Sequence, residues 1–142
     1  LAYVIDLTNI TNIKKYISEL DKNTFLLCTR SFNNQILYVS LIEKNKDYNR
    51  TAEIDVISNS KKRFRTFLKE SQIYLLWDHY IQCFDAISKT NKYDFMIFYM
   101  NPKNKFMMSA IEKGLINFVN DNYPIVSEKK KGKYYEYKFK LR

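Results

Sequence analysis

The stretch Tyr93-Asp-Phe-Met-Ile-Phe-Tyr-Met100 is strongly apolar, and Asn101-Pro102 follows it directly. A short apolar run that is bounded by turn residues is typical of a buried strand. An Asn followed by a Pro is typical of a helix cap and the first helical position. The stretch therefore predicts a buried strand over residues 93–100 and a helix from residue 102 to about residue 120.

Two more strands are expected after that helix, over residues 125–128 and 134–141. From Tyr135 to Leu141 every second residue is aromatic or aliphatic, and Glu or Lys occupies the positions between them. Alternation with a period of two is typical of a strand with one buried face. The basic turn Lys129-Lys-Lys-Gly-Lys133 separates the two runs, so the pattern predicts a β-hairpin.

The first half of the chain is predicted to contain three consecutive strands, over residues 24–31, 35–44 and 51–58. The segments between them are short, and consecutive strands with short turns indicate an antiparallel meander. Residues 3–5 are expected to form a further short strand.

Helices are expected on either side of the meander, over roughly residues 10–21 and in the region 61–89. In the second region an apolar stripe recurs at steps of three and four residues from Ile73 to Ile87. Because the apolar residues before Ser71-Gln72 do not continue this stripe, we expect two helices with a break at that point.

These elements predict an α+β fold with an antiparallel β-meander, packed helices and a C-terminal helix plus β-hairpin. The alternative is a three-layer α/β arrangement in which residues 93–100 pair in parallel with the first strand. A length of 142 residues is typical of one domain, so we expect residues 1–142 to form a single domain. Because Leu1 opens directly into an apolar run, we expect this domain to be a fragment of a longer protein.

The composition removes several classes of site. With only two glycines in the chain, neither a phosphate-binding loop nor a dinucleotide fingerprint can be built. With one histidine and two distant cysteines, no zinc site of known spacing can be assembled. We therefore expect no cofactor and no metal, and we expect His79 to have no catalytic role. Cys28 and Cys83 are interpreted as buried, reduced thiols, which indicates an intracellular protein.

The charge favours a polyanionic partner. The chain has 24 Lys and Arg residues against 15 Asp and Glu residues, a formal net charge of +9, and nucleic acid is the partner that we predict. A compositional bias of the genome also explains a Lys excess, because Lys, Asn, Ile, Tyr and Phe all have AT-rich codons. Only five of the basic residues are Arg, so we expect backbone contacts rather than base reading.

Two local clusters concentrate the basic residues. The first would lie at the start of a helix, where cations are unfavourable unless a polyanion compensates them. The second surrounds the C-terminal hairpin, where Tyr134 is a candidate platform for base stacking. The site residues that we predict are Lys61, Lys62, Arg63, Arg65 and Lys69 in the first cluster, and Lys129, Lys130, Lys131, Lys133, Tyr134 and Lys138 in the second.

The order of elements over residues 102–142, a helix followed by a basic hairpin, resembles the second half of a winged-helix module. That resemblance implies a helix in the major groove of DNA and a hairpin wing on phosphate. The ordinary interpretation of such a turn is a solvated loop between edge strands, where Lys discourages aggregation. Most aromatic residues fall at apolar-face positions, so we expect the majority of them in the core.

The resulting prediction is a non-catalytic domain that contacts the nucleic-acid backbone through the two clusters. One alternative is a protein-interaction domain, buried by a protein partner or by the remainder of a larger polypeptide. Another is a small metal-dependent nuclease, in which Glu53 and Asp55 on one strand face would hold a metal ion with a third carboxylate such as Asp94. No apolar stretch approaches the ~20 residues that span a bilayer.

Overall fold

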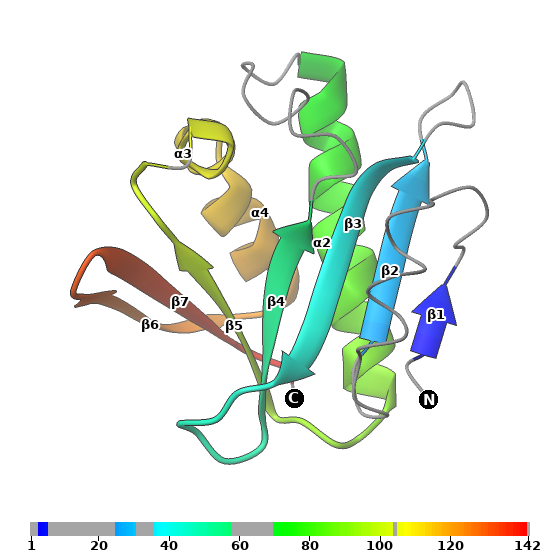
Figure 1. Cartoon of the computed structure of the whole chain (residues 1–142), viewed down its shortest axis with the longest axis vertical. Coiled ribbons are helices and arrows are strands. Elements are labelled where there is room, and N and C mark those ends of the chain that lie inside the picture. Colours follow the sequence, from blue (N-terminus) through cyan, green and yellow to red (C-terminus); the bar gives the residue numbers. More distant parts are fainter. Residues whose placement is uncertain (1–2, 6–24, 31–35, 58–69, 104, 142) are drawn as a thin grey trace.

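The computed structural model describes residues 3–5, 25–30, 36–57, 70–103 and 105–141. In this part of the chain seven strands form one mixed sheet, and three helices accompany it (Figure 1). The strands are β1 Tyr3–Ile5, β2 Phe25–Arg30, β3 Ile36–Lys44, β4 Thr51–Ile57, β5 Phe95–Met100, β6 Ile125–Lys131 and β7 Tyr134–Lys140. The helices are α2 Glu70–Lys89, α3 Lys105–Glu112 and α4 Leu115–Asn122.

The strand order across the sheet is β1-β2-β3-β4-β5-β7-β6. The strands β2, β3 and β4 are antiparallel neighbours in chain order, and β5 lies parallel to β4. Parallel neighbours need a crossover connection, and the chain between β4 and β5 includes α2. The strand β7 pairs antiparallel with β5 and with β6, so the C-terminal hairpin extends the same sheet.

The expectation of a mixed fold of helices and strands is therefore met. The alternative pairing is wrong, because the parallel neighbour of β5 is β4, whereas β1 pairs in parallel with β2. The winged-helix resemblance is also wrong. Both hairpin strands belong to the seven-stranded sheet, and α4 packs against α2 instead of projecting from the molecule.

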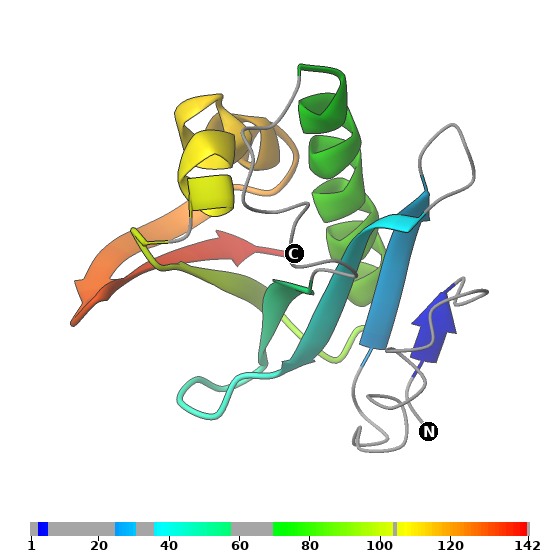
Figure 2. The same cartoon turned by 45° about the horizontal axis from the view of Figure 1, so that its top comes forward.

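The helices α2 and α4 lie on one face of the sheet, as the two views in Figures 1 and 2 show. The core forms between them and the sheet because α2 is amphipathic and presents Tyr80, Phe84 and Ile87 to the strands. Phe98 of β5 is 1% exposed, and its ring centroid lies 5.5 Å from that of Tyr80. Burial of aromatic side chains of this size contributes strongly to the stability of a core.

One helix prediction stays untested and another needs correction. The helix α2 begins at Glu70, and residues 61–69, like 10–21, lie outside the described part of the chain, so the break expected at Ser71-Gln72 stays a prediction. The single helix expected after Pro102 is in fact two, α3 and α4, which meet at Gly114. Gly114 has a φ of 102°, a backbone conformation that L side chains rarely adopt. Within the described residues no helix is long and apolar enough to cross a membrane.

Candidate functional site

The parallel strands β4 and β5 separate partway along their length. Their register runs over three residue pairs, from Thr51 opposite Phe95 to Glu53 opposite Ile97. In the described chain no β4–β5 pair follows, although β4 continues to Ile57 and β5 to Met100. We call the opening between residues 54–57 of β4 and 98–100 of β5 the wedge. Strand edges without a neighbour present backbone donors and acceptors to whatever enters.

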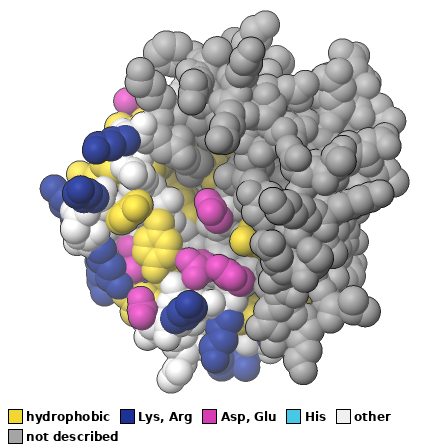
Figure 3. All heavy atoms as spheres, viewed as in Figure 1, with side chains coloured by type: hydrophobic (Ala, Val, Ile, Leu, Met, Phe, Trp, Pro, Cys, Tyr) yellow, Lys and Arg dark blue, Asp and Glu magenta, His cyan; other side chains and the backbone are white. Residues whose placement is uncertain are grey.

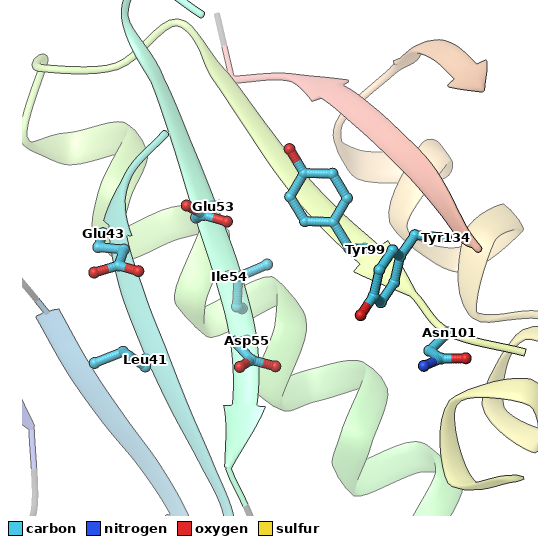
Figure 4. Close-up of a pocket in the computed structure, with 8 residues that line it drawn as sticks. All are labelled: Leu41, Glu43, Glu53, Ile54, Asp55, Tyr99, Asn101 and Tyr134. Atoms are coloured by element: carbon cyan, nitrogen blue, oxygen red, sulfur yellow. The ribbon is translucent and has the colours of Figure 1, made fainter. Parts of the chain in front are cut away.

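A pocket of about 270 Å³ lies at the wedge, on the sheet face turned away from α2 and α4, which we call the front face. Side chains from both sides of the wedge border it (Figure 4). The lining residues are Leu41, Glu43, Glu53, Ile54, Asp55, Tyr99, Asn101 and Tyr134.

Three of the lining residues are carboxylates. Glu43 of β3 lies opposite Glu53 of β4 in the antiparallel register, and Asp55 follows two residues later on the same face of β4. Burial raises the pKa of the Glu53 carboxyl, and the negative charges of Glu43 and Asp55 raise it further. In the coloured part of Figure 3, acidic side chains gather near the middle of the view, and Lys and Arg side chains lie to the left of them and below them. The pocket therefore favours a cationic ligand.

The opposite side of the pocket holds Tyr99 of β5. Its hydroxyl oxygen accepts a hydrogen bond from Asn45 Nδ2 at 3.0 Å. Burial raises the pKa of the Tyr99 hydroxyl, and the charges of Glu136 and Glu53 raise it further, whereas the hydrogen bond from Asn45 lowers it. Tyr99 is therefore a neutral phenol at physiological pH, and it lies within the electrostatic reach of Glu53.

A polar network lies next to Tyr99 and includes Glu136, its cross-strand neighbour on β7. Glu136 is fully buried, and Lys131 Nζ lies 2.9 Å from its Oε2. The Tyr48 hydroxyl donates to Glu136 Oε1 at 3.2 Å, and Lys131 Nζ donates to the Tyr48 oxygen at 2.7 Å. This network attaches the turn between β3 and β4 to the C-terminal hairpin.

The fold of this chain is similar to that of several solved structures. The fold resembles that of a spermidine N-acetyltransferase. A chimera of SpeG from Vibrio cholerae and hSSAT aligns over 90% of this chain and 74% of its own, with a TM-score of 0.52 and 8% identity. Mutant forms of the spermidine/spermine N-acetyltransferase SpeG from the same organism align over 91% of this chain and 73% of their own, with a TM-score of 0.49 and 10% identity. At these identities the likeness concerns the fold. No family model and no curated protein matches the sequence.

The prediction of a non-catalytic domain that contacts nucleic acid is therefore wrong, and so are its two alternatives. The likeness to an N-acetyltransferase overturns it, and the described pocket is acidic, which is unfavourable for a polyanion. The first predicted cluster, from Lys61 to Lys69, lies outside the described residues.

The second predicted cluster is only partly available to a ligand. Lys131 is engaged by Glu136 and Tyr48, and Lys138 lies over the rings of Tyr48 and Phe95 at 4.5 and 4.4 Å from their centroids. The side chains of Lys129, Lys130 and Lys133 are exposed on the hairpin. Tyr134 is 48% exposed and lines the pocket, so its surroundings are acidic as well as basic.

Glu53 and Asp55 share the front face, as predicted, and the third carboxylate in the pocket is Glu43 rather than Asp94. Asp94 forms an ion pair with Arg50 instead, with 2.8 Å between Arg50 Nε and Asp94 Oδ2. No group of three or more potential metal ligands was found among the described residues. Glu43 is one of the pocket residues that sequence reasoning missed. The tight β3–β4 turn sets the register that places it opposite Glu53, so the turn length was the signal.

The single histidine is part of the core. Its Nε2 lies 2.5 Å from Ser40 Oγ and 3.7 Å from Cys83 Sγ, and all three side chains are at most 1% exposed. Burial lowers the pKa of His79 to about 3, so the imidazole is neutral at physiological pH. The three side chains belong to the buried core, and the expectation that His79 has no catalytic role stays a prediction.

Proposed function

We propose that the protein is an N-acyltransferase, which moves an acyl group from a coenzyme A thioester to the nitrogen of an amine. The observation that carries the proposal is the acidic pocket at the point where β4 and β5 separate. The fold likeness to a structure whose name is spermidine N-acetyltransferase supports it.

The wedge suits the thioester donor. The pantetheine arm of coenzyme A carries amide groups, and an extended chain with such groups can pair with a strand edge as an added strand does. Residues 54–57 of β4 and 98–100 of β5 have such edges toward each other. We propose that the arm lies between them, so that the acyl group it carries reaches the pocket.

The phosphate groups of the coenzyme A thioester would need basic side chains to bind them. The segment that follows β4 in the chain carries Lys61, Lys62, Arg63, Arg65 and Lys69. Because the wedge opens toward the carboxyl end of β4, chain order favours this segment as the phosphate contact. The segment contains no glycine, so Lys and Arg side chains would bind the phosphates in place of a glycine-rich backbone loop.

The carboxylates suit the acceptor. An amine reaches the protein as an ammonium ion, and Glu43, Glu53 and Asp55 attract that charge to the pocket. The amine must lose a proton before its nitrogen can attack the acyl carbon. Glu53, whose pKa is raised, is the best-placed base because its carboxyl binds a proton more readily than an ordinary Glu.

The experiment incubates the purified protein with acetyl-CoA and a panel of primary amines, spermidine first among them. We expect release of free thiol together with an acetylated amine that mass spectrometry identifies. A substitution of Glu53→Gln should abolish most of the release, and the exposed Glu112→Gln on α3 should not. Absence of thiol release with every amine, from protein that is folded by circular dichroism and does not bind coenzyme A by calorimetry, would reject the proposal.

A second measurement tests the phosphate contact. Replacing Lys61 and Lys62 by Glu should raise the KM for acetyl-CoA and leave the KM for the amine unchanged. Replacing the exposed Lys129 and Lys130 by Glu provides a control with the same change of charge.

A further inference from the structure

Tyr134 is an aromatic side chain that the fold leaves half-exposed at the pocket. It is 48% exposed, and Val126 is the other exposed large apolar residue in the part of the chain that the structure describes. Tyr134 is among the residues that line the pocket at the wedge, and Val126 is not. An aromatic ring with exposed apolar surface gains free energy when a ligand covers it. Tyr134 is therefore a candidate ligand contact.

The C-terminal hairpin fixes the direction of the Tyr134 side chain. Tyr134 begins β7 and pairs with Lys131 of β6, across a turn in which Gly132 has a φ of 59°. Paired residues of antiparallel strands point to the same face of a sheet. Lys131 reaches the front face, where its Nζ lies 2.9 Å from Glu136 Oε2 and 2.7 Å from the Tyr48 hydroxyl. The Tyr134 ring therefore faces the front as well, at a hairpin end that the Lys131 contacts hold in place.

The lysines beside Tyr134 are engaged by other rings. A lysine ammonium group over an aromatic ring is held by a cation–π interaction. Lys131 Nζ lies 4.7 Å from the centroid of the Tyr48 ring, and Lys138 Nζ lies 4.5 Å from the same centroid. Lys138 Nζ also lies 4.4 Å from the centroid of the Phe95 ring. Within the described ranges, no Lys or Arg makes such a contact with Tyr134, so its ring is not covered by a cation of the described chain.

The wall that faces Tyr134 is acidic. Figure 4 shows Tyr99 and Tyr134 on one side of the pocket and Glu43, Glu53 and Asp55 on the other. An alkylammonium ion suits both walls, because the carboxylates attract its charge while the carbon atoms bonded to its nitrogen can lie on an aromatic ring. An amino acid would also bring a carboxylate to the acidic wall, and like charges repel. The two walls together favour an alkylamine over an amino acid.

Building on the proposed function, we propose that Tyr134 is the specificity-determining residue of the acceptor side, and that the acceptors are alkylamines with no acidic group beside the nitrogen. The Tyr134 ring covers the carbon atoms next to the nitrogen, and Glu43 and Asp55 attract the charge. The ring forms no bond and moves no proton, so it contributes to the affinity for the acceptor and not to the chemical step.

The kinetic test compares pentylamine with norleucine, which differs from it by one carboxylate group. We expect the kcat/KM of the wild-type protein to be roughly tenfold or more higher for pentylamine. Tyr134→Leu removes the ring and keeps an apolar side chain, so it should raise the KM for pentylamine roughly three- to tenfold and leave kcat and the KM for acetyl-CoA unchanged. Tyr134→Phe keeps the ring and should behave as the wild type does. Val126→Ala, at an exposed apolar residue that does not line the pocket, is the control.

A second readout does not depend on turnover. Choline carries a quaternary ammonium group that cannot be acylated, and calorimetry measures its binding to protein saturated with coenzyme A. We expect choline to bind equally to the wild type and Tyr134→Phe, and roughly three- to tenfold more weakly to Tyr134→Leu. The uncharged isostere of choline, in which a carbon atom replaces the nitrogen, should bind the wild type more weakly than choline does. If Tyr134→Leu does not fold, a nuclear Overhauser effect between the choline methyl groups and the Tyr134 ring in the wild-type protein decides the question.

The outcomes separate the two proposals. A wild-type protein that acylates no amine, yet binds choline in a way that depends on the Tyr134 ring, removes the proposed function and leaves the contact between Tyr134 and an alkylammonium group. A wild-type protein that acylates amines, with the same KM for pentylamine and the same choline affinity in Tyr134→Leu, removes this inference alone. A preference for norleucine over pentylamine would overturn the acceptor class.

Discussion

Arg50 and Asp94 join the two parallel strands at the closed end of the wedge. Arg50 Nε donates to Asp94 Oδ2 at 2.8 Å, and the backbone N–H of Asp94 donates to the carbonyl of Arg50 at 2.7 Å. Arg50 Nη2 also donates to the carbonyl of Asn91 at 2.8 Å. The β4–β5 pairing begins next to this junction, at Thr51 opposite Phe95, and ends at Glu53 opposite Ile97.

Weakening that junction should impair binding of the donor more than the chemical step. In Asp94→Asn the ion pair is lost while the backbone hydrogen bond remains, so the spacing of β4 and β5 is held less tightly. We expect the KM for acetyl-CoA to rise by roughly five- to tenfold and kcat to change little. Steady-state kinetics measures both, with the exposed Asp121→Asn on α4 as the control. A lower kcat at constant KM would contradict this role for the junction.

Glu53→Gln should abolish the low-pH limb of the rate profile. A base works only after it has lost its proton, and the raised pKa of Glu53 moves that loss above the usual range of a glutamate. In the wild-type protein kcat/KM should therefore rise with pH through the pKa of Glu53. In Glu53→Gln the rate should be about 100- to 10,000-fold lower, and that limb should be absent. An unchanged limb in the variant would assign it to another group.

His79 should make the fold sensitive to mild acid. Burial lowers its pKa from 6.5 to about 3, so the unfolded chain binds a proton below pH 6.5 while the folded chain does not. The stability that His79 contributes is therefore complete above pH 6.5 and is lost as the pH falls toward 3.

Urea unfolding of the wild-type protein and of His79→Gln measures this contribution. Between pH 7 and pH 5 the wild-type protein should lose about 2 kcal/mol of unfolding free energy more than His79→Gln, which has no group that titrates there. Equal pH slopes in the two proteins would show that His79 is protonated inside the fold.

Gly114→Ala should destabilise the junction of α3 and α4. Gly114 has a φ of 102°, and a Cβ there would lie 3.8 Å from Trp77 Cζ2, which is an ordinary contact. The cost therefore comes from the backbone, and we expect about 1–2 kcal/mol by thermal or urea unfolding. Gly132→Asn is the matched control, because a φ of 59° with no atom within 4 Å is a conformation that Asn tolerates. A loss as large in the control would contradict the backbone explanation.

Local patterns in the sequence predicted most of the strands. The apolar run at residues 93–100 became β5, and the alternating run at the C-terminus became β7. The period of two in β4 correctly placed Glu53 and Asp55 on one face.

The candidate site was largely missed, because its members are distant in sequence. Tyr99 was interpreted as one more residue of a buried strand, although it lines the pocket. Asn45 lies between two predicted strands, and its hydrogen-bond partner Tyr99 is 54 positions away. The excess of Lys directed the functional prediction to polyanions, whereas Glu43 and Glu53 make the pocket acidic.

The sequence by itself determined which residues form strands and which faces of those strands are apolar, because side-chain alternation is a local property of the backbone. It did not determine that β5 lies parallel to β4, or that their pairing stops after three residue pairs. Those features depend on how α2 packs across the sheet and on how Arg50, Asp94 and the β3–β4 turn hold the strand ends. Only the tertiary structure brought Glu43, Glu53 and Tyr99 to the same pocket.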